Sequence, residues 1–123
     1  MAYDLEERTF RFAVAVRALS RSLPIDIANR EDLRQIVRSS GSVGANYIEA
    51  NDGISRSDFA YRIKVSKKEA KESIYWLRLL AESNPSSGLF AESLMASVAS
   101  NSDDAKTRLK DFLEKRGKKV LRG

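Results

Sequence analysis

The chain has 123 residues, contains neither cysteine nor histidine, and carries a formal net charge of +5. Without these two residue types it cannot form disulfides, the usual zinc sites, or nucleophilic systems that use an imidazole base. Its glycines do not form a phosphate-binding loop of either common pattern. We therefore expect no metal, no cofactor and no enzymatic activity.

The net charge is unevenly distributed along the chain. Residues 1–114 contain equal numbers of basic and acidic side chains, so the whole excess lies in the last nine residues, as Lys115, Arg116, Lys118, Lys119 and Arg122. We predict one folded domain over 1–114 and a basic, disordered tail over 115–123. The chain has no apolar run of about 20 residues and no apolar signal segment near its start. These features predict a cytoplasmic protein with no membrane partner.

Three breaks, at Pro24, Asn51–Gly53 and Pro85, divide the chain into four segments with helical periodicity. In the first segment, Asp4 begins a capping box with Glu7. Apolar residues then recur on one helical face, and the helix must end before Pro24. The predicted buried face consists of Leu5, Phe12, Val16 and Leu19.

The second segment is expected to begin near Asn29 and contains a stretch of small residues over 39–44. This stretch has weak helix propensity, so it could form a loop or a helix whose small face admits a neighbouring backbone. The apolar spacing stays in phase from Leu33 to Tyr47, which favours the continuous helix.

The third segment is expected to begin at Ser55 or Ser57, and the fourth to follow Pro85 with Leu94 at the start of its apolar face. The third segment carries two apolar rows, which indicates that it is contacted from two sides and has a further partner. The second of these rows is Tyr61, Val65, Trp76 and Leu79. Together the four segments predict an all-α, antiparallel up-down-up-down four-helix bundle.

Basic residues share one face of the predicted third helix, and two more lie a turn apart on the second. Such a face can follow a phosphate backbone, or it can be an ordinary solvated face balanced by Glu69 and Glu72. The candidate nucleic-acid-binding residues are Lys64, Lys67, Lys68, Lys71 and Arg78, with Arg34 and Arg38 on the second helix.

Three polar residues stand out within the apolar patterns: Asn46, Glu49 and Glu72. Buried polar groups need hydrogen-bond partners, so we expect structural bonds to a neighbouring helix, with Arg34 or Arg38 as partners for Glu72. A ligand site or a subunit contact is the alternative. A Glu49–Glu72 pair could in principle perform acid–base chemistry, but the sequence does not fix the distance between them.

A longer pattern runs from Arg38 to Leu80. It reads RSSGSVGANYIEAN over 38–51, then Ser57-Asp-Phe59, then KVSKKEAKESIYWL over 64–77. This pattern resembles a family of bacterial four-helix-bundle proteins encoded in intervening sequences of large-subunit ribosomal RNA genes. The close match covers about a third of the chain.

The resemblance implies a small cytoplasmic bundle that assembles into homo-oligomeric rings, with a pentamer as the expected form. Related proteins accompany the reverse transcriptases of diversity-generating retroelements and bind nucleic acid through a basic surface. We therefore expect a non-enzymatic homo-oligomer with RNA or DNA as the partner. The alternative is a protein–protein adaptor or scaffold with no nucleic-acid role.

Overall fold

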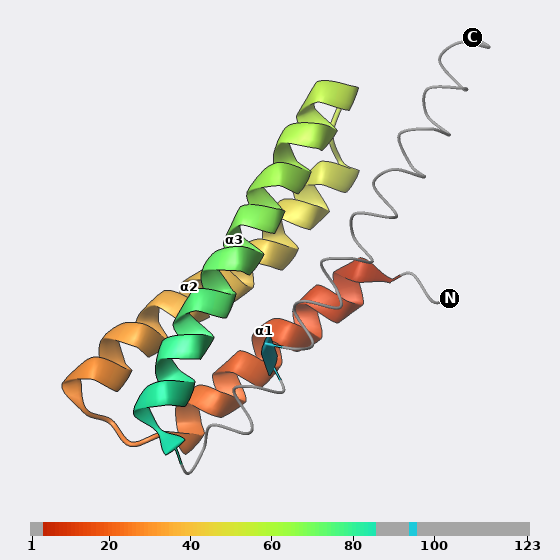
Figure 1. Cartoon of the computed structure of the whole chain (residues 1–123). Helices are drawn as coiled ribbons and strands as arrows, with labels where there is room; N and C mark the ends of the chain where they lie inside the picture. Colours follow the sequence, from red (N-terminus) through yellow and green to blue (C-terminus); the bar gives the residue numbers. More distant parts are fainter. Residues whose placement is uncertain (1–3, 86–93, 96–123) are drawn as a thin grey trace, which may run out of the picture.

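The computed structural model describes residues 4–85 and 94–95. Three helices make up most of this part: α1 (Leu5–Ser22), α2 (Ile27–Asn51) and α3 (Arg56–Ser83). They alternate in direction as an up-down bundle, and α2 packs against both α1 and α3 (Figure 1). The predicted all-α class is confirmed. The predicted fourth helix, except for Leu94 and Met95, and the tail over 115–123 lie outside the described residues.

Side chains cap the first and third helices at the positions that the sequence indicates. An Asp4 carboxylate oxygen accepts a hydrogen bond from the Glu7 backbone N–H at 3.0 Å. The Ser55 hydroxyl accepts one from the Asp58 backbone N–H at 3.1 Å. Each bond satisfies one of the free N–H groups of a first helical turn.

The second helix begins two residues before the predicted start at Asn29. Asp26 is its cap and accepts a hydrogen bond from the Asn29 backbone N–H at 2.8 Å. Asn29 is instead buried, and its side-chain amide pairs reciprocally with that of Asn84 at 2.9 and 2.8 Å. The same two side chains also donate to the backbone carbonyls of Pro24 and Leu80. This amide pair joins the start of α2 to the end of α3.

The small residues of α2 form a continuous part of the helix, so the loop alternative over 39–44 is wrong. Gly44 is buried against α1. A Cβ atom added to Gly44 would lie 2.9 Å from the Thr9 hydroxyl oxygen, closer than such atoms approach in proteins. At Gly41, the nearest atom to an added Cβ is the end of the Arg17 side chain, at 3.7 Å. The close approach of α1 and α2 therefore depends on Gly44.

Serines line the contact between α2 and α3. The hydroxyls of Ser39 and Ser73 lie 2.8 Å apart and are completely buried. Further along, the Ser66 hydroxyl donates to the Val43 carbonyl at 2.8 Å. Small side chains allow the two helices to approach closely, and these hydrogen bonds satisfy the buried hydroxyls.

The apolar core lies where side chains of all three helices meet. Its fully buried members include Val16 and Leu19 of α1, Ile36 of α2 and Leu77 of α3. Leu94, predicted to be on the apolar face of the fourth segment, is also part of this cluster. None of the helices in the described part of the chain is both long and apolar enough to cross a membrane.

Candidate nucleic-acid interface

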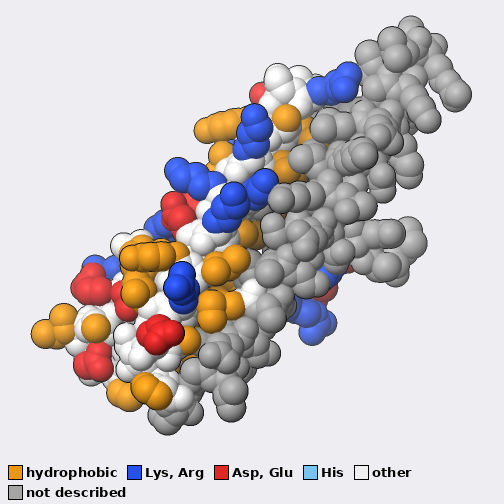
Figure 2. Space-filling model, in the orientation of Figure 1, with side chains coloured by type: hydrophobic (Ala, Val, Ile, Leu, Met, Phe, Trp, Pro, Cys, Tyr) orange, Lys and Arg blue, Asp and Glu red, His pale blue; other side chains and the backbone are white. Residues whose placement is uncertain are grey.

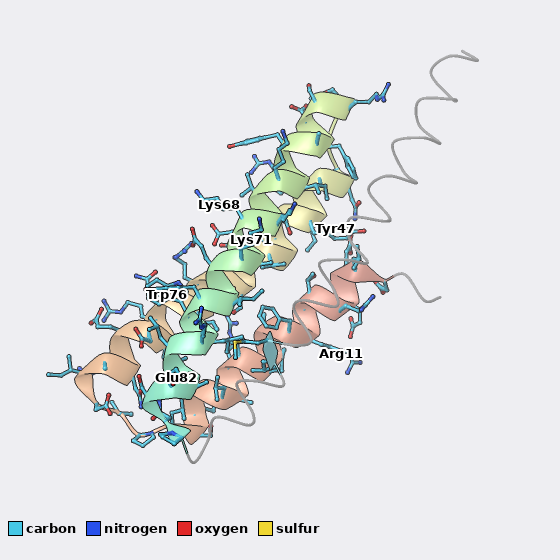
Figure 3. All side chains as sticks on the ribbon, in the orientation of Figure 1. Arg11, Tyr47, Lys68, Lys71, Trp76 and Glu82 are labelled. Carbon is cyan, nitrogen blue, oxygen red and sulfur yellow. The ribbon has the colours of Figure 1, made fainter. Side chains whose placement is uncertain are left out.

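Four of the predicted basic residues lie along one exposed line of α3: Lys64, Lys68, Lys71 and Arg78. We call these four residues the basic row. Figure 2 shows Lys and Arg side chains gathered over α3, and Figure 3 labels two of them, Lys68 and Lys71. Within the described ranges, no carboxylate forms a salt bridge with any of the four. Lys67, which the sequence places with them, is half-buried beside the row.

Glu69 and Glu72, the carboxylates of α3 that could neutralise the basic row, form salt bridges with α2 instead. Arg38 of α2 forms salt bridges with Glu69 at 3.3 Å and with Glu72 at 2.9 Å. Burial lowers the pKa of Arg38, but these two carboxylates outweigh it and raise the pKa above its ordinary value. Arg38 is therefore engaged in an ion-pair triad between α2 and α3, and the cations of the basic row are not part of it.

Arg62 of α3 connects the other two polar residues of α2. One of its nitrogens lies 3.2 Å from a Glu49 carboxylate oxygen, and another donates to the Asn46 side-chain oxygen at 3.3 Å. The Asn46 amide also donates to the Ser42 carbonyl at 2.9 Å. These contacts fix the upper half of the α2–α3 pair in the orientation of Figure 1.

Glu49 and Glu72 do not come together as a pair of carboxylates. Glu49 contacts Arg62, which precedes Glu72 by ten residues on α3. At 1.5 Å per helical residue this is roughly 15 Å along the bundle, too far for a shared reaction. Among the described residues, no three acidic side chains are arranged to hold a metal ion.

Two tyrosines continue the line of the basic row, and sequence reasoning did not include them in the candidate site. Tyr61 and Tyr75 are 58% and 56% exposed. Tyr61 precedes Lys64 by three residues, and Tyr75 lies between Lys71 and Arg78. Their three- and four-residue spacing from Lys64, Lys71 and Arg78 could have placed both tyrosines on the face of the basic row. Tyr61 also fitted an apolar row of the third segment, so it was assigned there. Arg34, the remaining candidate, is exposed on α2 and outside this line.

Comparisons with known proteins agree with this three-helix arrangement. One similar crystal structure is that of a Bacteroides thetaiotaomicron protein of unknown function from the S23 ribosomal protein family, whose sequence is 28% identical to this chain. It superimposes with a TM-score of 0.73, covering 85% of this chain and 97% of the other. No curated protein matches the chain. The profile of the 23S rRNA-intervening sequence proteins matches residues 2–103, and the chain therefore belongs to that family.

Proposed function

We propose that the protein is a non-enzymatic, cytoplasmic homo-oligomer of four-helix bundles that binds RNA or DNA through the basic row of α3. The observation that carries this proposal is the row itself. Its four cations are exposed, follow one line, and have no carboxylate partner among the described residues. Lys64, Lys68 and Lys71 follow one another at four- and three-residue spacing, roughly 5 Å apart along the helix, and Arg78 lies seven residues, roughly 10 Å, beyond Lys71. A line of positive charge on one helix face complements the phosphates of a polyanion.

Apolar side chains on the flank of α3 support the oligomeric part of the proposal. Val65, Trp76 and Leu79 are only half-buried in the single chain, and contact with a second copy would bury them further. The family resemblance adds the expectation of a pentamer. An oligomer carries several copies of the basic row. A long polyanion that contacts more than one copy is bound more tightly than it would be by a single copy.

Light scattering tests the oligomer directly. One chain has a mass of 13.8 kDa, so five chains give about 69 kDa. A mass near that of one chain at micromolar concentration would contradict the oligomeric part of the proposal.

Salt-dependent binding tests the nucleic-acid part. Each neutralised phosphate contributes a log–log slope of about −0.9 on duplex DNA and about −0.7 on a single strand. The triple variant K64Q/K68Q/K71Q should bind much more weakly and with a shallower slope. Deletion of 115–123 measures the separate contribution of the tail.

A charge-matched control removes three arginines from other exposed positions, as R11Q/R21Q/R30Q. These arginines lie on α1 and at the start of α2, and Figure 3 labels Arg11. The control should retain most of the affinity. Equal losses in the two triple variants would mean that only total charge matters, and an absence of binding at about 50 mM salt would reject the nucleic-acid role.

A second candidate function is a protein–protein adaptor. Phe10 and Val14 lie one turn apart on α1 and are 61% and 48% exposed, so they offer an apolar contact independent of charge. An adaptor would retain its partner in a pull-down after nuclease treatment and at high salt. It would lose that partner in the variant F10S/V14S and keep it in K64Q/K68Q/K71Q.

A further inference from the structure

One unbroken line of seven exposed side chains follows α3 from its second turn to its end. The line alternates spacings of three and four residues and includes the whole basic row. Its members, all exposed, are Tyr61, Lys64, Lys68, Lys71, Tyr75, Arg78 and Glu82. Tyrosines therefore enclose three lysines, and Glu82, labelled in Figure 3, ends the line with a negative charge.

Neighbouring side chains contact both tyrosine rings while leaving them exposed to solvent. The Arg62 guanidinium lies 5.7 Å from the centre of the Tyr61 ring. The Trp76 ring meets the Tyr75 ring edge to face, with centres 5.0 Å apart and planes at 78°. These contacts restrict the rings before any ligand arrives, so little additional ordering is needed on binding.

The spacing of the rings and charges fits a nucleic-acid strand better than a protein partner. Fourteen residues separate Tyr61 from Tyr75, or roughly 21 Å along the helix, which is the length of about six stacked nucleotides at 3.4 Å each. The lysines between them would contact the phosphates. A second helix packed on this line would instead have to bury lysines, which is costly without acidic partners.

We propose that this line binds single-stranded RNA or DNA, with bases stacked on Tyr61 and Tyr75 and phosphates paired with the lysines between them. The inference rests on the proposed nucleic-acid function and specifies its ligand. Aromatic stacking requires an unpaired base face, and a duplex does not offer one along its length. The line therefore prefers a single strand over a duplex of the same length.

Fluorescence anisotropy with a labelled twelve-nucleotide oligo(U) or oligo(dT) and a twelve-base-pair duplex tests the proposal. In Y61L or Y75L the single-strand affinity should fall by about five- to 150-fold. Y61F and Y75F should stay within about twofold, because phenylalanine keeps the ring. The salt slope should be unchanged in the leucine variants, and duplex binding should not respond to any of the four.

Two further variants sharpen the test. F10L removes an equally exposed aromatic ring from α1 and should leave single-strand binding unaltered. E82Q removes the only negative charge of the line and should tighten binding. Far-UV circular dichroism verifies that each variant keeps its helices.

The outcomes separate this inference from the function on which it rests. Equal binding of single strand and duplex, unaffected by Y61L and Y75L, overturns the stacking proposal and leaves the nucleic-acid function standing. An absence of binding to either probe overturns both. Binding of poly-glutamate together with an absence of oligonucleotide binding also overturns both, and identifies the line as a site for an acidic protein.

Discussion

Replacing Gly44 with alanine tests how α1 and α2 approach each other. The new Cβ atom would lie 2.9 Å from the Thr9 hydroxyl oxygen and 3.3 Å from the Thr9 Cβ. The hydroxyl cannot rotate away without loss, because it donates to the carbonyls of Leu5 at 2.7 Å and Glu6 at 3.1 Å. The clash must therefore be relieved by moving a helix or by breaking these hydrogen bonds.

The magnitude follows from two opposing contributions. Alanine is more favourable than glycine in a helix interior by about 1 kcal/mol, whereas overpacking a tight contact costs about 1–3 kcal/mol. G44A should therefore lower the free energy of unfolding by about 1 kcal/mol, or Tm by about 4 °C. G41A places its Cβ in ordinary contact, 3.7 Å from Arg17. It should raise the stability by up to about 1 kcal/mol.

Urea unfolding followed by far-UV circular dichroism measures both effects in the same assay. The double variant T9A/G44A removes the hydroxyl from the clash, so T9A should be less damaging in the G44A background than in the natural chain. If G44A stabilises the protein as much as G41A does, or if the two changes are simply additive, the close contact does not limit the approach of the helices.

Three other changes test polar side chains of α2 and α3. Burial, and then the neighbouring Asp26 and Glu31, raise the pKa of Asp32 above its ordinary value. The protonated carboxyl is therefore favoured in the folded protein, so Asp32 contributes its full stabilisation at low pH. This contribution is lost as the pH rises through the folded-state pKa of Asp32. D32N should accordingly stabilise the protein at neutral pH, and the gain in urea midpoint should vanish below the ordinary carboxyl pKa of 3.8. S66A removes a buried hydrogen bond and should cost about 1 kcal/mol in the same unfolding experiment. R38M breaks an ion-pair triad whose arginine is half exposed, so it should cost about 1 kcal/mol, and a loss that did not shrink with added salt would contradict this assignment.

The helices could be predicted from the sequence because their signals are local. Apolar residues at three- and four-residue spacing, with Asp4 and Ser55 as caps, mark the faces and starts of α1 and α3. The start of α2 was misplaced because Asn29 is a good cap by type, whereas its amide is required by Asn84, which lies 55 positions away. Sequence proximity offers no signal for such a contact.

The charges of the candidate site were predictable, and so was the pairing of Glu72 with Arg38, one of the two arginines expected for it; the other pairings were not. Helical spacing placed Lys64, Lys68 and Lys71 on one face. The partners of Arg38 depend on the register of α2 against α3, which brings together residues 31 and 34 positions apart. The exposure of Tyr61 was also missed, because tyrosine is compatible with both a buried and a solvated helix face.

The amide pair of Asn29 and Asn84 also bears on the order of folding. The short turn over residues 52–55 connects α2 to α3, so contacts near it close small loops, whereas the amide pair closes a loop of 55 residues. Loop-closure entropy grows with loop length, and helical proteins with contacts near in sequence fold quickly. We expect the contacts between α2 and α3 to form first near the turn and then progressively away from it. The amide pair would form last, and it would protect the start of α2 and the end of α3 against fraying.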